Sequence, residues 1–258
     1  MQRLDLLLTE RGLCRSRSQA QQIIADERVS YRIDNHWKTT TKPGLKLSEE
    51  TELHITPGGA DHFVSRGALK LLDALEYCPI PIKGAIALDI GQSTGGFTDC
   101  LLQQGATRVI GIEVGHDQLA QKLRQDPRVI CYEGSNARNL DKDELLQHTA
   151  GNGFDLVVMD VSFISQTLIL PGLPPLLKPG GVLISLVKPQ FEVGPEGVGK
   201  GGIVRDNSLY NEVQDKIIQC CEAHGLEPFA YRESPIQGAD GNHEFLLLAR
   251  RPAQEEES

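Results

Sequence analysis

Long apolar runs are missing from this chain of 258 residues, and their absence excludes several classes of protein. A helix that spans a bilayer needs about 18 or more consecutive apolar residues, and no stretch approaches that length. The first residues, MQRLDLLLTERG, carry charges inside their apolar stretch, unlike a secretory signal peptide. We therefore expect a cytoplasmic protein with no membrane partner, because a membrane-lytic role would need a segment that the sequence lacks.

Disulfide and metal-ligand patterns are missing as well. The six cysteines include no C-x-x-C pair and lie in apolar patterns, so we expect them to be reduced and buried. The histidines show no spacing typical of metal ligands. We therefore expect no metal.

A glycine-rich stretch, LDIGQSTGGFTDCLLQQGA at residues 88–106, is the most informative part of the sequence. An apolar strand leads into a glycine turn and then into a helix expected to open at Phe97, and such a loop offers free backbone N–H groups to a ligand. The pattern G-x-G-x-x-G is missing, which argues against a nicotinamide dehydrogenase. Asp89 lies where its carboxylate would repel a pyrophosphate and attract a cation.

This acidic loop favours S-adenosylmethionine, which carries a sulfonium and an amino group. The next strand, RVIGIEV, ends in Glu113, about 20 residues beyond the loop, where nucleotide sites place a carboxylate on ribose hydroxyls. The loop residues expected to contact the cofactor are Asp89, Gly91, Ser93, Thr94, Gly95, Gly96 and Phe97. The alternative is that the glycines only form a tight turn between strand and helix.

Strand and helix patterns alternate through most of the chain. Further strands are expected in RVIGIEV, RVICYEG, FDLVVMD, GGVLISLVKPQF and HEFLLLARR. This alternation predicts an α/β fold with a parallel, doubly wound sheet, whose ligands bind at the carboxyl ends of the strands. Asp89, Glu113, Asp160 and Lys188 all fall at such ends.

Two lysines and two carboxylates form a candidate catalytic set. Lys188 ends an apolar strand, where a lysine is seldom tolerated without a partner, and Asp160 ends the strand before it. Lys70 and Glu244 complete the set. Because two lysines disfavour each other's charge, one of them could be neutral and take the proton from a ribose 2′-hydroxyl, while the carboxylates orient the lysines. The alternative is a purely structural ion-pair network.

The formal charge of −9 is unevenly distributed along the chain. Residues 1–47 hold nine Lys or Arg against five acidic residues, which leaves −13 for the remainder. Helix patterns in LDLLLTERG and SRSQAQQIIADERV, followed by short strands, predict a small α+β module at this end. Its basic residues could contact phosphates, or form an ordinary solvated surface. The residues expected to bind RNA are Arg3, Arg15, Arg17, Lys42 and Arg66.

The chain resembles the TlyA, or hemolysin A, family, whose members join an αL-type RNA-binding domain to an FtsJ-like ribose methyltransferase domain. The matching stretches are VSRGALKL, DIGQSTGGFTD, QLAQKLRQDPRV, SNAR, MDVSFIS, LVKPQFEVG, GKGGIVRD and GNHEFLL. The resemblance implies an RNA-binding domain at residues 1–58, a linker at 59–66, a Rossmann-like class I methyltransferase domain with a mainly parallel seven-stranded sheet at 67–251, and an acidic tail at 252–258.

The resemblance also implies 2′-O-methylation of cytidine in ribosomal RNA, in the large subunit alone or in both subunits. Lys70, Asp160, Lys188 and Glu244 would be the catalytic set, and Asp160 and Asn136 would join the cofactor contacts. The expected partners are ribosomal RNA or ribosomal subunits, and the protein is expected to be a monomer. A hemolysin-like or catalytically inactive RNA-binding protein is the alternative. The chain departs from the family at Ala68, at Gln92, and in YRIDNHWK, which replaces the usual valine-asparagine-glycine turn.

Overall fold

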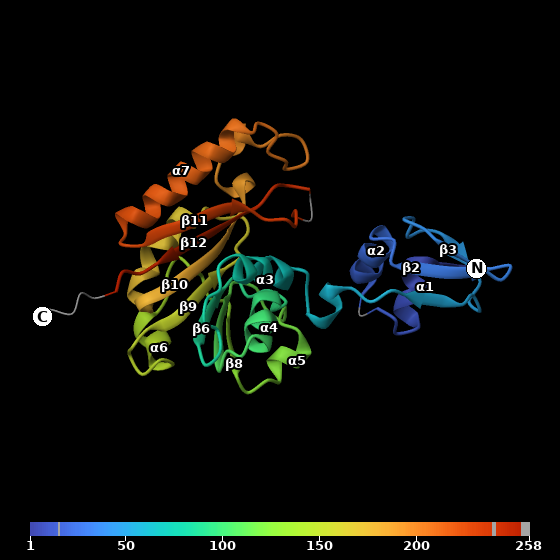
Figure 1. Cartoon of the computed structure of the whole chain (residues 1–258), viewed down its shortest axis with the longest axis horizontal. Coiled ribbons are helices and arrows are strands. Elements are labelled where there is room, and N and C mark those ends of the chain that lie inside the picture. The colour runs from blue at the N-terminus through green and yellow to red at the C-terminus, as the bar shows by residue number, and fades with distance from the viewer. Residues whose placement is uncertain (15, 239–240, 254–258) are drawn as a thin grey trace, which may run out of the picture. The chain divides into compact units, whose positions relative to one another are not determined.

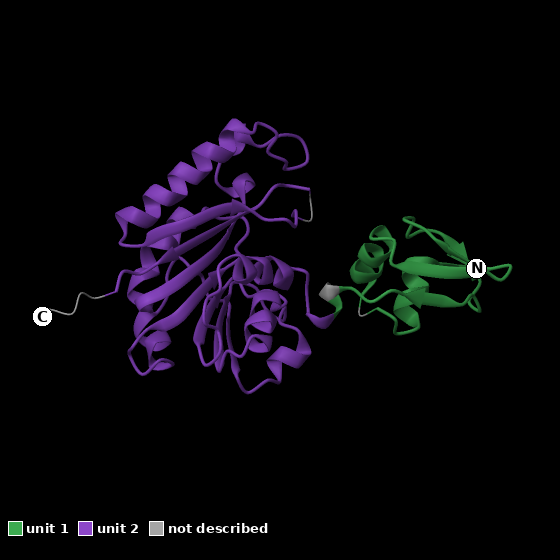
Figure 2. Cartoon of the chain, viewed as in Figure 1, with its two compact units in different colours: residues 1–61 green, residues 62–258 purple. Residues whose placement is uncertain are grey.

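The chain forms two compact units, residues 1–61 and residues 62–258 (Figure 2). The computed structural model describes residues 1–14, 16–238 and 241–253. Arg15, one of the residues expected to bind RNA, and most of the predicted acidic tail lie outside these described residues. The division between the units falls within the predicted linker.

The N-terminal unit consists of two helices and two small sheets, as the sequence predicts for an α+β module (Figure 1). Helices α1 (Leu4–Glu10) and α2 (Arg17–Ala25) bury their apolar sides in a core that contains Leu4, Leu8 and Ile24. Strands β1 (Gln2–Arg3) and β4 (Lys46–Leu47) pair with each other, and a second antiparallel sheet has the order β3-β2-β5. The latter strands span His36–Thr39 (β3), Val29–Ile33 (β2) and Leu53–Ile55 (β5).

The carboxylate of Asp5 is the polar centre of this unit. Its side chain is fully buried, and it accepts hydrogen bonds from the guanidinium groups of Arg3 and Arg17 and from the Gln21 amide, with distances of 2.9 Å. The two arginine side chains remain 41% and 52% exposed. The hydrogen bond from Arg3, together with Arg17 and Gln21, holds the pKa of Asp5 well below its usual range despite burial.

The second unit is built on a seven-stranded sheet with the order β11-β12-β10-β9-β6-β7-β8 (Figure 1). Strand β12 is antiparallel to both of its neighbours, while β10, β9, β6, β7 and β8 pair in parallel. The strands span Ile86–Ile90 (β6), Arg108–Glu113 (β7), Val129–Glu133 (β8), Phe154–Met159 (β9), Leu177–Val187 (β10), Glu227–Glu233 (β11) and Phe245–Arg250 (β12). The predicted Rossmann-like fold is confirmed, although β11 was not among the strands expected from the sequence.

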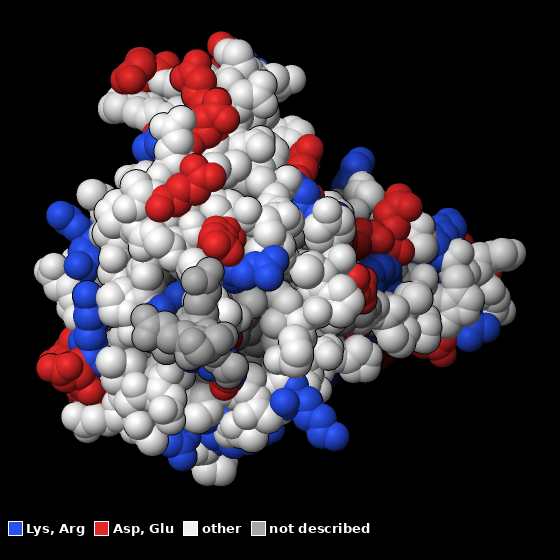
Figure 3. All heavy atoms as spheres, turned by 60° about the vertical axis from the view of Figure 1, so that its left-hand side comes forward, with Lys and Arg blue, Asp and Glu red and all other residues white. Residues whose placement is uncertain are grey.

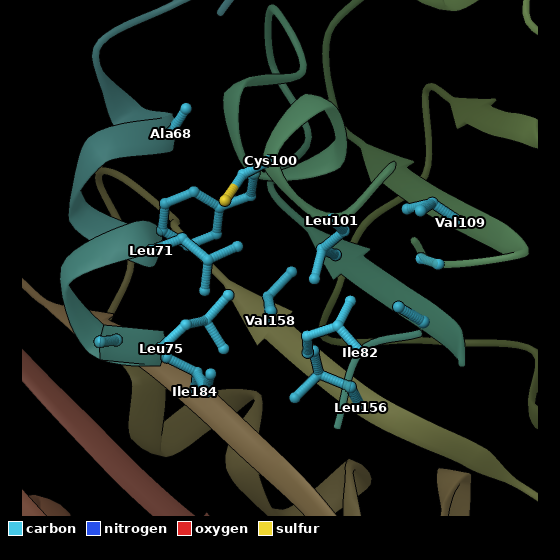
Figure 4. Close-up of a cluster of buried hydrophobic side chains, with 14 of the residues drawn as sticks. Ala68, Leu71, Leu75, Ile82, Cys100, Leu101, Val109, Leu156, Val158 and Ile184 are labelled. Carbon is cyan, nitrogen blue, oxygen red and sulfur yellow. The ribbon is translucent and has the colours of Figure 1, made fainter. Parts of the chain in front are cut away.

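Helices cover both faces of this sheet. Alternate strand residues face two separate cores, so that Leu156 and Val158 contribute to one core and Val157 and Met159 to the other. Figure 4 shows the first core, where Leu71 lies on a helix packed over the sheet. The helices are α3 (Gly67–Tyr77), α4 (Gly96–Gln103) and α5 (Gln121–Arg124) beside the first core, and α6 (Lys142–Gln147) and α7 (Ser208–Ala223) beside the second.

Short 3-10 turns occur mainly on the side of α6 and α7. They span Gly59–His62 (η1), Gln166–Leu168 (η2), Leu170–Gly172 (η3), Pro174–Leu176 (η4), Pro189–Phe191 (η5) and Pro195–Gly197 (η6). In the described residues no helix is both long and apolar enough to cross a membrane. Basic and acidic side chains are interspersed on the face shown in Figure 3.

All six cysteines are free. Cys14, Cys100 and Cys221 are buried, as expected. The expectation of burial was wrong for the other three, which are half-buried because they lie at the edges of the cores: Cys78, Cys131 and Cys220.

Replacing Asp5 should destabilise the N-terminal unit selectively. We expect Asp5→Asn to lower its free energy of unfolding by about 1–3 kcal/mol, because the charged acceptor of Arg3 and Arg17 is lost. The fluorescence of Trp37, the single tryptophan, reports on this unit during urea unfolding. This stabilisation of the native state is present above the unfolded pKa of about 4 and is lost as the pH falls toward the lower folded value, so the variant should lose this acid dependence.

Asp26→Asn, at an exposed position of the same unit, serves as the control. Equal stability of the two variants would contradict the stabilising role given to Asp5.

Candidate active site

A cavity of about 180 Å³ is lined by the glycine loop, the start of α3, the residue that follows β9 and the segment after β11. Gly91 follows β6 with a φ of +81°, and a Cβ at this position would lie 2.3 Å from the carbonyl oxygen of Asp160. Only glycine fits both the backbone angle and this close approach. Gly95 also has a positive φ, of +90°, and it caps the N-terminus of α4. The chain thus turns sharply at the carboxyl end of the sheet, where it opens backbone groups to the cavity.

Most of the predicted loop residues line this cavity. The lining includes Gly91, Ser93, Thr94, Gly96 and Phe97. Three other predicted residues, Arg66, Lys70 and Asp160, line it as well. The structure adds residues that were not predicted as contacts, namely Ser65, Gly67, Gln92, Ile236 and Gln237.

Asp89 lies beneath the loop in a buried polar chain. Its Oδ2 accepts a hydrogen bond from the Thr98 hydroxyl at 2.6 Å, and the Gln92 amide donates to the same hydroxyl at 2.8 Å. Burial is the main cause that raises the pKa of Asp89 to about 7. Within the described part of the chain, Asp89 Oδ1 and Gln92 Oε1 are buried and have no hydrogen-bond donor. Two such acceptors fit a ligand that brings N–H donors or positive charge.

Glu113 connects the glycine loop to the next strand. Its side chain accepts hydrogen bonds from the backbone N–H groups of Ser93 at 2.7 Å and Gly115 at 2.8 Å. Asn136 lies apart from the first cavity, since it lines a second hollow of about 300 Å³ together with Ile112 and other residues. The structure therefore places Glu113 directly beside the loop and Asn136 in a neighbouring hollow.

The four residues of the candidate catalytic set form two ion pairs. Lys188 Nζ lies 2.6 Å from Asp160 Oδ1 and donates a hydrogen bond to the Ser162 hydroxyl at 3.0 Å. Lys70, from α3, forms an ion pair with Glu244, which immediately precedes β12. All four side chains are at most 25% exposed. Each lysine thus has a carboxylate of its own, and Lys70 and Asp160 bring both pairs to the wall of one cavity.

Sequence reasoning missed a buried network that supports this wall. Glu192, whose side chain is 1% exposed, accepts hydrogen bonds from Ser165 Oγ at 2.6 Å and from the backbone N–H of Gln166 at 2.7 Å. The Gln166 amide donates to the carbonyl of Leu186 at 2.6 Å and accepts from Ser185 Oγ at 2.7 Å. These bonds hold the segment after Asp160 against the segment around Lys188. The only signal in the sequence was the concentration of polar residues in SFISQ and KPQFE.

The residues expected to bind RNA have different surroundings. Arg66 is exposed at the N-cap of α3 and lines the cavity, and Lys42 is exposed in the N-terminal unit. Arg3 and Arg17 are held by the buried carboxylate of Asp5, which reduces their freedom to reach a phosphate. Among the described residues, no group of three or more His, Cys, Asp or Glu side chains could hold a metal ion.

The sheet order, the glycine loop and the cavity above it define the class of the second unit as a Rossmann-like methyltransferase. The FtsJ-like methyltransferase family model matches residues 63–251, and the S4 domain model matches residues 2–31.

Relatives match nearly the whole chain. The 16S/23S rRNA (cytidine-2′-O)-methyltransferase TlyA of Mycobacterium tuberculosis is 41% identical over 96% of this chain and 89% of its own length. Hemolysin A of Brachyspira hyodysenteriae is 39% identical over 95% and 98%. The solved structure of a candidate hemolysin from Streptococcus thermophilus aligns with a TM-score of 0.75 at 39% identity, covering 97% of this chain and 88% of its own. The chain belongs to the TlyA, or hemolysin A, family of FtsJ-like methyltransferases, as the sequence motifs predicted.

Replacing Glu192 should destabilise the protein more than replacing Lys216, the exposed cation that pairs with it. We expect Glu192→Gln to lower the free energy of unfolding by about 1–3 kcal/mol, because a buried acceptor of three hydrogen bonds is changed. Lys216 is 41% exposed and pairs with Glu192 at 3.2 Å. We expect Lys216→Met to lower the free energy of unfolding by less than about 1 kcal/mol. Urea unfolding of both variants measures the difference, and the reverse order would contradict the role given to Glu192.

Proposed function

We propose that this protein transfers a methyl group from S-adenosylmethionine to the 2′-hydroxyl of a cytidine in ribosomal RNA of the large subunit, with the small subunit as a second substrate to be tested. One observation carries the proposal: Lys70 and Asp160, each from a different lysine–carboxylate pair, line the same cavity as the glycine loop. The name of the Mycobacterium tuberculosis relative supports this choice of substrate.

The residues around the glycine loop fit S-adenosylmethionine. The buried acceptors Asp89 Oδ1 and Gln92 Oε1 suit its amino group and positive charge. Glu113 would hold the ribose hydroxyls, and the hollow that contains Asn136 would receive the adenosine end. When bound, the cofactor supplies an electrophilic methyl group. These assignments use the carboxyl ends of β6, β7 and β8, where ligands of such sheets bind.

The two ion pairs would divide the work of proton transfer. Glu244 is 4% exposed and pairs with Lys70, whose ammonium group can stabilise the negative charge that develops on the 2′-oxygen. Asp160, which is 25% exposed, and the Ser162 hydroxyl orient the amine of Lys188, to which we assign the role of the base. The neutral amine of Lys188 would then accept the proton of the 2′-hydroxyl, while the methyl group would pass to the 2′-oxygen from the cofactor sulfur, which keeps the electron pair of the broken bond.

The N-terminal unit would bring RNA to this chemistry. Its match to the S4 domain and the exposed Lys42 support phosphate contacts, whereas Arg3 and Arg17 are ion-paired with Asp5 and keep only part of their side chains exposed. Arg66, at the cavity, would contact the backbone next to the reacting ribose. We place this activity in the cytoplasm, where ribosomes are assembled.

Lys188→Met should abolish most of the turnover without preventing cofactor binding. We expect the rate constant kcat to fall by about 10²–10⁴-fold, because a positioned base contributes that much, and the cofactor Kd to change by less than about twofold. The assay follows transfer of tritiated methyl groups to isolated 50S and 30S subunits.

Lys178→Met is a matched control for this variant. Lys178 lies on β10, the strand that Lys188 immediately follows, and pairs with Asp155 of β9. Neither Lys178 nor Asp155 lines the cavity, whereas Asp160, the partner of Lys188, does. We expect it to retain wild-type turnover. Retained turnover in Lys188→Met, or an equal loss in both variants, would contradict the assigned role of Lys188.

Cofactor affinity should depend on the protonation of Asp89. Because the pKa of this buried carboxyl is raised to about 7, it is mostly neutral at pH 6 and mostly ionised at pH 8. The ionised form attracts the positive charge of S-adenosylmethionine, so affinity should increase with pH by up to about tenfold across this interval. Calorimetric titration at a series of pH values measures the dependence. Asp89→Asn should flatten it, and a pH-independent Kd in the unmodified protein would contradict the placement of the cofactor charge.

A further inference from the structure

An aromatic side chain lies on the outward face of the sheet β3-β2-β5. Trp37, the single tryptophan of the chain, is 52% exposed on β3, a strand whose residues are all exposed. The core side of this sheet is formed by Val29, with Tyr31 and Leu53 partly buried against the core. Side chains alternate along a strand, so Ser30 and Arg32 belong to the opposite face. Trp37 is the cross-strand partner of Arg32 and therefore shares that face.

Basic and imidazole groups surround the tryptophan. The Arg32 guanidinium carbon lies 5.9 Å from the centroid of the Trp37 ring, and the His54 ring is 6.3 Å away in an edge arrangement. The cross-strand pair next to Arg32 and Trp37 on this face is Ser30 and Thr39. Their small side chains leave the ring of Trp37 accessible. Glu52 is ion-paired with Arg32 at 2.9 Å, which offsets its negative charge.

This combination fits a nucleobase better than a protein surface. A base can stack on an exposed aromatic ring, and a nearby guanidinium adds a favourable interaction with both rings. Large exposed apolar patches mark many protein-binding surfaces, whereas the neighbours of Trp37 on this face are Arg32, His54 and hydroxyl-bearing residues. Residues 1–47 also hold nine basic and five acidic residues, and one of these acids, Asp5, is buried beneath two arginines.

We propose that Trp37, with Arg32 and His54, forms a stacking platform for one unpaired base of the ribosomal RNA substrate. The proposal rests on the proposed function, since it takes RNA as the partner of the N-terminal unit. It adds a contact that the S4 match, which ends at residue 31, does not include. The hairpin that carries Trp37 turns through Asp34 and Asn35, both with positive φ, within the stretch YRIDNHWK.

Tryptophan fluorescence tests the platform directly, because Trp37 is the only source of the signal. The full chain is titrated with a single-stranded 12-nucleotide RNA and with a fully paired RNA duplex of the same length. We expect the single strand to quench the emission in a saturable way and the duplex to leave it nearly unchanged, since paired bases cannot leave the stack. Equal quenching by both RNAs, or quenching by neither, would overturn the proposal.

Substitution supplies the second test. Trp37→Leu should weaken binding of the single strand, followed by anisotropy of a labelled RNA, by about 5- to 100-fold, the range for loss of one base stacked on an aromatic side chain. Trp37→Phe keeps a ring and should recover part of the affinity. Tyr77→Leu is the matched control, because Tyr77 is 57% exposed and lies 4.6 Å beneath the guanidinium of Arg232 on the other unit. We expect its affinity to equal that of the unmodified protein.

Turnover separates this proposal from the proposed function. With ribosomal subunits as substrate, Trp37→Leu should raise the KM for the subunit and leave kcat within about twofold, because the platform is not part of the catalytic set. An unchanged KM together with an unchanged RNA affinity would overturn the platform while leaving the methyltransferase intact. Absence of methyl transfer by the unmodified protein, with quenching still present, would overturn the proposed function alone.

Discussion

Parallel pairing of β9 and β10 is the constraint on which the candidate active site depends. The register places Met159 opposite Ser185, so Asp160 and Lys188 follow at the same edge of the sheet. Because Asp160 and Lys188 follow neighbouring strands, the pairing of the strands itself brings their opposite charges together as an ion pair. Strand β12 extends the same edge with Glu244, and the helix α3 supplies Lys70 to meet it. The candidate catalytic set therefore comes from four elements that the apolar cores align, and the network around Glu192 holds the segments that follow Asp160 and Lys188.

The buried polar groups beneath the cavity cost folding free energy, because two of their acceptor atoms have no hydrogen-bond donor in the described residues. Asp89 is desolvated, close to the charges of Asp160 and Glu113, and only one of its oxygens has a donor in the described residues. Gln92 belongs to the same chain of groups through Thr98 and lines the cavity, so it also shapes the cavity floor. Such a site is less stable when empty than an apolar one would be. We interpret this cost as the physical basis of cofactor affinity.

Much of this arrangement could be predicted from the sequence, because it depends on short local patterns. Apolar strands that end in Asp89, Asp160 and Lys188 identify the sheet edge, and glycine spacing identifies the loop. The partners of each charge were harder to predict, since the pairing of Lys70 with Glu244 joins residues far apart in the chain. Strand β11 was missed because none of its residues is fully buried, although Ala230 packs against one core and Tyr231 against the other, so its apolar pattern is weak. The sequence did not indicate that Arg3 and Arg17 both bind the buried carboxylate of Asp5, because only the folded N-terminal unit brings the three residues together.

Identification of the modified nucleoside tests the central claim most directly. Ribosomal subunits incubated with the protein and S-adenosylmethionine would be digested to nucleosides and analysed by mass spectrometry. The account predicts 2′-O-methylcytidine, in large-subunit RNA at least, since the lysine–carboxylate pairs are suited to activating a ribose hydroxyl. A methyl group on a base, or no methylated nucleoside despite measurable cofactor binding, would contradict it.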